Sequence, residues 1–196
     1  MNIFFLHDDT EACAQLHNDS HCIKMILETS QLLCTAAREL GFENVPYKST
    51  HKNHPCAVWA RTNRSNFQWL QELGMALCRE YEYRYSPKKP HKSQAVLEMM
   101  YTGSGLGREV YESLESRSMS RLPQCMPEEY KVDCTDAVKW EGWVPRTIRA
   151  YRNYYLGEKA GFSKWTKRDV PKFMAPVDRG MGISYIGDSL NKNEED

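Results

Sequence analysis

Two long segments whose apolar residues recur at helical spacing constrain the fold of this chain most strongly. Between residues 20 and 40, apolar residues follow one another at steps of three and four, and Gly41 supplies a C-terminal stop. Between residues 56 and 85 a broad apolar and aromatic face has the same period, and Pro55 suits the first turn of that helix. The sequence therefore predicts two long helices. On the first, the residues expected to face the core are Ile23, Ile26, Leu27, Leu33, Cys34, Ala37 and Leu40.

Shorter signals place the remaining elements. NIFFL is expected to be an extended segment, after which Asp8, Asp9 or Thr10 can cap a helix, with a break near Asn18. A short helix is expected from 93 to 100, a weakly structured helix or insertion at 106–122, and a late helix at 145–159. We expect a mainly α, compact single-domain helical fold with long loops and a loose C-terminal tail.

The expected domain organisation is simple. Residues 1–172 would form one helical catalytic domain, with 101–122 as an insertion or lid, and residues 173–196 an extended or disordered tail.

Composition favours a cytosolic globular protein. Hydrophobic residues make up 41% and charged residues 27% of the chain, and no stretch approaches the length of a membrane span. The N-terminus lacks the basic and long apolar regions of a signal peptide. We therefore expect no membrane partner and a cytoplasmic location, which is the host cytoplasm if a phage encodes the chain.

The cysteines indicate reduced, mostly buried thiols. There are seven, an odd number, and no CxxC pair is present, which suits neither a zinc ribbon nor a disulfide framework.

Charge is segregated along a chain whose formal net charge is zero. Residues 46–92 and 138–172 each carry nine Lys or Arg against three acidic residues. Two basic, aromatic-rich segments can form one face for a polyanion if the fold brings them together, and ordinary charge scatter is the alternative.

One polar stripe on the first long helix has the composition of a reactive site. The spacing of His17, His21, Lys24, Glu28 and Gln31 puts them on one face, opposite the apolar face. A solvated face is the alternative, although such a face more often shows many Lys and Glu without histidine.

Further histidines lie in two basic loops. His51 and His54 stand in THKNHPC, and His91 and Lys92 in PHKS, where they suit an anion such as a nucleic-acid phosphate. His54 can instead cap the helix that follows it.

A metal site is a rival interpretation of these histidines. In it His17 and His21 would bind one ion with a loop histidine, and Glu28 would act as the base. The pattern lacks the HExxH order, so no metal ligand and no cofactor is assigned. There is also no P-loop, no GxGxxG after a strand and no GxSxG, which argues against nucleotide hydrolysis and dinucleotide redox chemistry.

Several segments, taken in order, resemble a known enzyme family. They are an INxF-like N-terminus, HCIKMILE, HPCAVWARTNRSNFQWLQELGMALCREYEYRY, MPEEYKVD and YRNYYLGEK. This order is similar to the small all-α pyrimidine-dimer DNA glycosylases with AP lyase activity, the endonuclease V type known from phages. The chain also resembles small phage proteins that share segments like HPCxxW and HKS, for which the likeness implies a DNA-related role.

The resemblance implies a mechanism. In that family a helical histidine precedes the catalytic glutamate by seven residues, as His21 precedes Glu28. The terminal α-amine, which unlike a lysine side chain is substantially unprotonated near neutral pH, attacks the sugar C1′ to form an imine. The glutamate carboxylate stabilises the cationic intermediate and abstracts a proton for strand cleavage.

The sequence departs from the family pattern in two respects. Leu27 and Gln31 stand where arginines usually grip phosphates, and Asn2 is large enough for Met1 to be retained as the attacking residue. Lys24, one turn from Glu28, is the alternative amine.

These interpretations predict a DNA-processing enzyme that cleaves an N-glycosidic bond, with DNA or a nucleotide as its substrate. The alternatives are a phage nucleobase-modifying transferase or hydrolase, a metal-dependent hydrolase, and a noncatalytic DNA-binding protein. The predicted catalytic residues are Glu28, His21, Met1 and Lys24. The predicted substrate-binding residues are His17, Gln31, His51, His54, Arg61, Arg84, His91 and Lys92.

Overall fold

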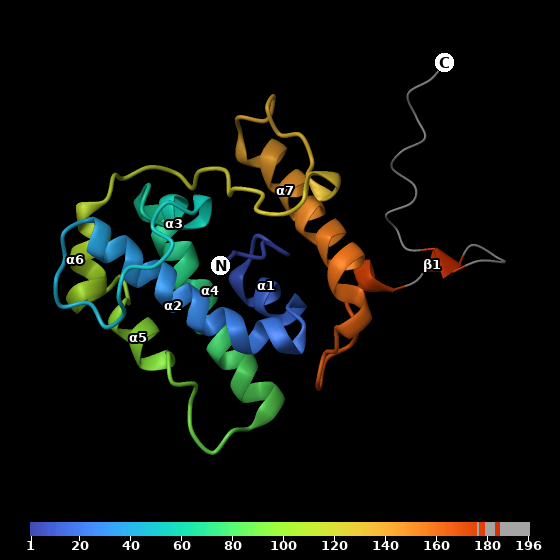
Figure 1. The fold of residues 1–196 in the computed structure, drawn as a ribbon, viewed down its shortest axis with the longest axis horizontal. Helices are drawn as coiled ribbons and strands as arrows, with labels where there is room; N and C mark the ends of the chain where they lie inside the picture. Colours follow the sequence, from blue (N-terminus) through green and yellow to red (C-terminus); the bar gives the residue numbers. More distant parts are fainter. Residues whose placement is uncertain (176, 179–182, 185–196) are drawn as a thin grey trace.

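The computed structural model describes residues 1–175, 177–178 and 183–184. Helices α2 (Asp19–Glu39) and α4 (Arg64–Tyr85) pack against each other at the centre of the fold (Figure 1). Gly74 lets them approach closely, because a Cβ there would lie 2.6 Å from Leu97 Cδ2 and 2.9 Å from Thr29 Cγ2. The prediction of a mainly α fold is confirmed.

Polar caps set where the first helices begin. Helix α1 (Thr10–Leu16) follows Asp9, whose side chain accepts a hydrogen bond from the Ala12 N–H. Asn18 caps α2 by accepting from the His21 N–H at 2.8 Å. The predicted cap among residues 8–10 and the predicted break near Asn18 are therefore confirmed.

The predicted single helix over 56–85 is wrong, because it is two helices. Helix α3 (Pro55–Ala60) ends at Arg61, and Asn63 caps α4 by accepting from the Asn66 N–H at 2.9 Å. An asparagine side chain satisfies one of the free N–H groups of a helix start, so it favours a new beginning at this point.

The remaining helices are shorter. They are α5 (Gln94–Met99), α6 (Gly105–Ser113), η1 (Glu128–Tyr130), α7 (Trp140–Tyr154), η2 (Tyr155–Lys159), η3 (Ala160–Phe162) and η4 (Lys172–Met174). The segment predicted as a weak helix over 106–122 is helical only to Ser113, and the late helix starts at Trp140, before the predicted 145.

Beyond η4, strands β1 (Val177–Asp178) and β2 (Ile183–Ser184) pair antiparallel, with Val177 opposite Ser184. Most of the predicted loose tail lies outside the described residues.

The apolar N-terminal segment is part of the core. Residues 3–6 are buried, and the segment lies between the α2–α4 pair and α7 (Figure 1). The rings of Phe5 and Trp143 stack at 6.1 Å between centroids, and Arg152 of α7 donates to the Leu6 carbonyl at 2.9 Å. Burial of these apolar side chains fixes a chain end that would otherwise fray.

Not all of the predicted core face of α2 is buried. Ile26, Leu33, Cys34 and Ala37 are fully buried, as expected, whereas the side chains of Ile23 and Leu27 are each 40% exposed and Leu40 is 36% exposed. Ile23 and Leu27 are four residues apart, so they share a strip that the neighbouring helices leave open.

All seven cysteines are free, and six of them are buried, as the composition predicted. Across the described residues, no helix combines the length and apolarity that a bilayer span needs.

Candidate active site

The carboxylate of Glu28 contacts both candidate amines. Its Oε1 lies 3.2 Å from Lys24 Nζ, and its Oε2 lies 3.9 Å from the Met1 amine. Oε2 also accepts a 3.0 Å hydrogen bond from the Asn2 N–H. The side chains of Met1 and Glu28 are 3% and 12% exposed, whereas that of Lys24 is 65% exposed. One carboxylate thus lies between the amine of a residue whose side chain is buried and a solvent-facing lysine.

Asn2 fixes the terminal segment through its side chain. Its Nδ2 donates to the Cys125 carbonyl at 2.9 Å, its Oδ1 accepts from the Ile3 N–H at 2.8 Å, and the Tyr151 hydroxyl oxygen lies 3.2 Å from that Oδ1. These contacts join the N-terminus to the 114–127 loop and to α7. The amine of Met1 therefore has little freedom relative to Glu28.

Tyr151 supports this arrangement from α7. Its hydroxyl donates to the Pro123 carbonyl at 2.7 Å, and burial raises the pKa of the phenol well above its usual value. The hydroxyl stays protonated and acts as a fixed donor beneath Asn2.

The His21 ring is held in a fixed orientation, two turns before Glu28 on the same helix. It stacks on Phe4 with centroids 4.2 Å apart, and its Nδ1 lies 2.6 Å from the Tyr155 hydroxyl. Burial, assisted by His17, Lys159 and Lys24, lowers the pKa of His21 to about 3, so the ring is neutral near pH 7. His21 therefore positions the N-terminal segment through Phe4.

The predicted continuous stripe is wrong for His17. This residue follows α1 and does not belong to α2; it is fully buried, and its Nδ1 lies 2.8 Å from the Cys13 carbonyl. Burial lowers its pKa to about 4. The Asn18 cap starts a new helix and turns His17 away from the α2 face, so the structure places His17 out of reach of a substrate.

His54 lies at the start of α3, in the first basic loop. It caps α3, with its Nδ1 accepting from the Cys56 N–H at 3.2 Å. Burial and the nearby terminal amine lower its pKa. The predicted capping role is confirmed. His51, in the same loop, is exposed, with its Nδ1 2.7 Å from the Thr50 hydroxyl.

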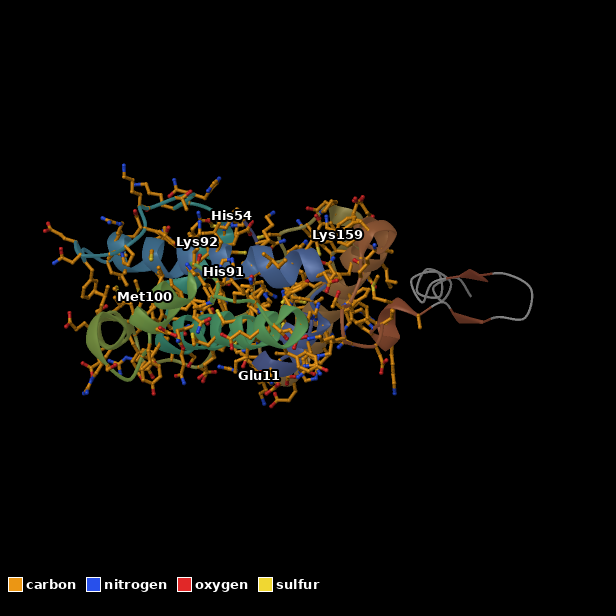
Figure 2. All side chains as sticks on the ribbon, turned by 90° about the horizontal axis from the view of Figure 1, so that it is seen from below. Glu11, His54, His91, Lys92, Met100 and Lys159 are labelled. Carbon is orange, nitrogen blue, oxygen red and sulfur yellow. The ribbon has the colours of Figure 1, made fainter. Side chains whose placement is uncertain are left out.

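The second basic loop, which holds His91 and Lys92, lies on the same side of the molecule as His54. Figure 2 shows His54, His91, Lys92 and Lys159 on the side that carries α2, while Glu11 lies on the opposite side. The Ser93 carbonyl next to this loop accepts a 3.3 Å hydrogen bond from Ser30, a residue of α2. Burial lowers the pKa of His91, whereas Lys92 is exposed. Gln31 is half-buried, one turn after Glu28.

Two predicted substrate-binding arginines have structural partners. Arg84 is fully buried and pairs with Glu80 at 2.7 Å and with Asp19 at 2.9 Å, so the structure contradicts direct contact with a substrate. A buried carboxylate needs a paired cation, and that need explains the placement of Arg84. Arg61 donates to the carbonyls of Lys52 and Ala57, which ties the loop of residues 51–54 to α3.

Sequence reasoning missed a thiol pair beside the terminus. The Sγ atoms of Cys56 and Cys125 lie 3.6 Å apart, and Cys56 Sγ lies 3.7 Å from Asn2 Oδ1. The Cys56 thiol donates to Cys125, which lowers the pKa of Cys125 and raises that of Cys56. In the sequence, the one local feature that could have pointed to this thiol pair is the segment HPC, in which a histidine and a cysteine stand two residues apart.

The metal set considered from the sequence is not formed. Among the described residues, the one group of three His, Cys, Asp or Glu side chains close enough to hold an ion is His54, Cys56 and Cys125. His17 and His21 are absent from it, because their ring nitrogens point to Cys13 and Tyr155.

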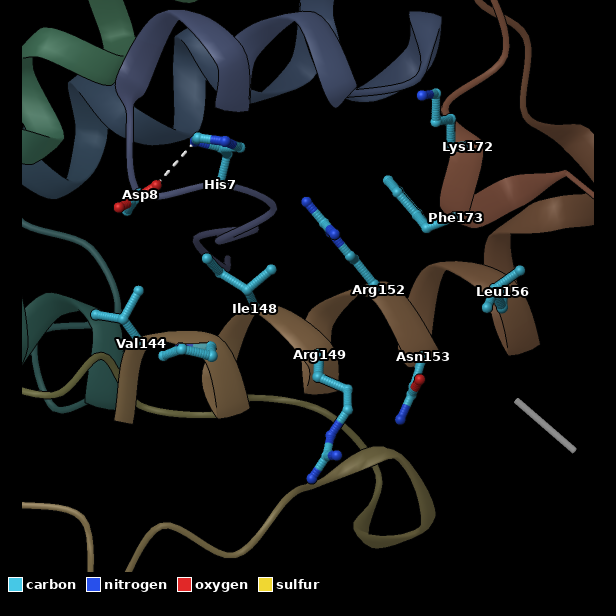
Figure 3. Close-up of a pocket in the computed structure, with 11 residues that line it drawn as sticks. His7, Asp8, Val144, Ile148, Arg149, Arg152, Asn153, Leu156, Lys172 and Phe173 are labelled. Carbon is cyan, nitrogen blue, oxygen red and sulfur yellow. Dashed lines mark ion pairs between the residues drawn. The ribbon is translucent and has the colours of Figure 1, made fainter. Parts of the chain in front are cut away.

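A separate cavity of about 670 Å³ lies between His7, Asp8, α7 and η4 (Figure 3). Its lining includes Arg152, whose guanidinium already bonds the Leu6 carbonyl and lies 5.0 Å from the Phe173 ring. None of the residues around Glu28 lines it, so it is distinct from the candidate active site.

Residues 1–93 match the family model of pyrimidine dimer DNA glycosylase. The resemblance predicted from the sequence is therefore confirmed, and the match supports a glycosylase-like function at family level. No curated protein and no solved structure matches the chain.

The matched region contains Met1, Lys24, Glu28 and the two basic loops. It ends before Cys125 and Tyr151, which hold Asn2 from the other side.

Proposed function

We propose that this chain is a DNA N-glycosylase with lyase activity, which forms an imine between the Met1 α-amine and the deoxyribose of a damaged pyrimidine nucleotide. The observation that carries the proposal is the contact of the Met1 amine and the Asn2 N–H with one oxygen of Glu28. The family match over residues 1–93 supports DNA as the substrate.

In the first step, the unprotonated Met1 amine attacks C1′ with its lone pair. The bond from C1′ to the base breaks, and the base leaves with that electron pair and takes up a proton. The attacking nitrogen loses a proton, and its lone pair forms a second bond to C1′ while the C1′–O4′ electrons pass to O4′. O4′ takes up a proton as the sugar ring opens, and a C1′=N⁺ imine remains. The Glu28 carboxylate stabilises this cation at close range.

In the second step, Glu28 removes a proton from C2′. The electrons of that C–H bond pass toward C1′, the C3′–O bond breaks, and the phosphate leaves with its electron pair. Water then hydrolyses the imine and restores the amine. A single carboxylate serves both steps, because the carbon atoms involved are neighbours.

Met1 is better placed than Lys24 to be the nucleophile. Its side chain is 3% exposed, and its neighbour Asn2 is held by three further groups, whereas the Lys24 side chain is 65% exposed. A fixed amine loses less entropy on reaching its transition state. In this proposal Lys24 instead holds the Glu28 carboxylate in place through their 3.2 Å ion pair.

DNA would approach the side of α2. Glycosidic attack requires the nucleotide to be unstacked, and an apolar side chain can fill the space it leaves. Ile23 and Leu27 are 40% exposed and flank Lys24 and Glu28 on α2, which suits them to that role. Lys92 and the histidines His51, His54 and His91 would contact the DNA backbone.

Borohydride trapping tests the proposal. The full chain would be mixed with duplexes that carry either a thymine dimer or an abasic site, reduced, and analysed by intact mass and peptide mapping. We expect a covalent adduct on Met1 in the parent chain and in Lys24→Gln, and a large loss of strand cleavage in Glu28→Gln. Glu72→Gln, an exposed glutamate on α4, is the matched control.

Each alternative gives a different result. An adduct on Lys24 would show that Lys24, and not Met1, is the nucleophile. A folded chain with no adduct on either duplex would refute the lyase mechanism. Turnover that required a small co-substrate would then favour a base-modifying transferase, and loss of turnover on chelation a metal-dependent hydrolase.

A further inference from the structure

Three side chains with zinc-binding chemistry meet beside the chain terminus. One nitrogen of His54 and the Sγ atoms of Cys56 and Cys125 all lie within 4.8 Å of one another. They come from segments far apart in sequence, the start of α3 and the loop before η1. Imidazole and thiolate are the ligands that zinc binds most often in proteins.

The distance between the sulfur atoms fits a shared ion. Cys56 Sγ and Cys125 Sγ are 3.6 Å apart. A disulfide bond would hold them at about 2.0 Å. Two thiolates on a tetrahedral zinc ion, each at about 2.3 Å from the metal, lie about 3.7–3.8 Å apart. The distance between the two sulfur atoms therefore already matches that of two thiolates bound to one zinc ion.

The three ligands are held in place by their surroundings. His54 and Cys56 belong to the cap and first turn of α3, so the backbone sets their separation. The Cys125 carbonyl accepts from Asn2 Nδ2, and the Cys125 N–H lies 3.4 Å from the Tyr151 hydroxyl. Cys56 is buried, while His54 and Cys125 are half-buried, which leaves a path by which an ion can enter.

We propose that the reduced chain binds one zinc ion through the His54 imidazole and the Cys56 and Cys125 thiolates, with the fourth position open to a small ligand. Binding releases the two thiol protons to solvent. It also ends the hydrogen bond from the Cys56 N–H to His54 Nδ1, because that nitrogen either binds the ion or carries the proton. The proposal does not depend on the glycosylase assignment.

The ion would restrict the movement of the N-terminal segment. Asn2 Nδ2 donates to the Cys125 carbonyl, and this hydrogen bond does not involve a thiol proton, so it is kept when the ion binds. A metal that joins the cysteines would lock α3, the 114–127 loop and the N-terminal segment together. The position of the Met1 amine relative to Glu28 would then depend on the ion.

Metal content of the purified full chain provides the test, with zinc measured by mass spectrometry and cobalt(II) as a spectroscopic probe. The ligand variants are Cys56→Ser, Cys125→Ser and His54→Asn, the last of which keeps a capping side chain but removes the imidazole. Cys134→Ser is the matched control, because Cys134 is buried in the loop after Cys125 and lies outside the cluster.

We expect one zinc per parent chain, a thiolate-to-cobalt charge-transfer band, and a zinc affinity at least about 100-fold lower in each ligand variant but unchanged in Cys134→Ser. A reduced, folded parent chain that binds no zinc at micromolar concentration would overturn the proposal. Zinc retained by both cysteine variants would do so as well. A chain isolated as a Cys56–Cys125 disulfide that binds no zinc after reduction would assign the pair to redox chemistry instead.

Discussion

Replacing Glu28 by glutamine separates the chemical role of this residue from its structural one. The two side chains have nearly the same shape, so the amide oxygen can still accept from the Asn2 N–H, a hydrogen bond of 3.0 Å in the parent chain. The substitution removes the negative charge that faces Met1 and Lys24.

The expected effects differ greatly in size. A hydrogen bond to a charged group contributes about 1.5–3 kcal/mol and a neutral one about 0.5–1.5 kcal/mol, so weakening the Asn2 contact costs about 1 kcal/mol. Loss of the exposed ion pair with Lys24 adds about 0.3–0.5 kcal/mol. The melting temperature of a chain of this size should therefore fall by only about 3–6 °C. Removing a general base should slow strand cleavage by about 10²–10⁴-fold.

The assay is single-turnover cleavage of a duplex with one abasic site, followed in parallel with thermal unfolding by circular dichroism. Glu72→Gln should alter neither quantity appreciably. A folded Glu28→Gln chain that cleaves at the parent rate would refute the assignment of Glu28, and a melting temperature lowered far beyond the expected range would show that its role is mainly structural.

Three other perturbations test the surroundings of Glu28. Asn2→Leu keeps a large second residue but removes the amide contacts, so borohydride trapping should slow by about 100-fold; an unchanged rate would contradict the anchoring role. Gln31→Arg should tighten DNA binding and raise the magnitude of its salt dependence by about one unit, measured by fluorescence anisotropy; an unchanged slope would place DNA elsewhere. His17 and His21, with pKa values lowered from 6.5 to about 4 and about 3, stay neutral in the folded chain while the unfolded chain takes up protons. Stability should therefore fall as pH drops below about 6.5, by up to about 1.4 kcal/mol per pH unit for each histidine, and urea titrations should show a shallower dependence for His21→Phe.

Local patterns predicted the helices well. The spacing of Ile26, Leu33 and Ala37 indicated the buried side of α2, and Asn18 and Pro55 marked helix starts. Such signals act over one or two turns, so they can be recognised within a short stretch of sequence. Periodicity could not show that Ile23 and Leu27 lie beyond the edge of the neighbouring helices, because exposure depends on what packs there.

The candidate site was predictable only in part. Glu28 and Lys24 were found because they share a helix face. The pairing of Cys56 with Cys125 joins residues 69 positions apart, and that of Asn2 with Tyr151 joins residues 149 positions apart. Neither pair leaves a local pattern, and both depend on how α7 and the 114–127 loop return to the N-terminus.

The two parts of the chain contribute differently to the site. The region that matches the glycosylase family, residues 1–93, holds the groups to which we assign chemistry, among them Glu28 and the terminal amine. The rest of the chain supplies Tyr151 and Cys125, which contact Asn2. Because a terminal amine on a free chain end would sample many positions, its usefulness as a nucleophile depends on such contacts. The region outside the family match is therefore where we expect the geometry of the site to be set.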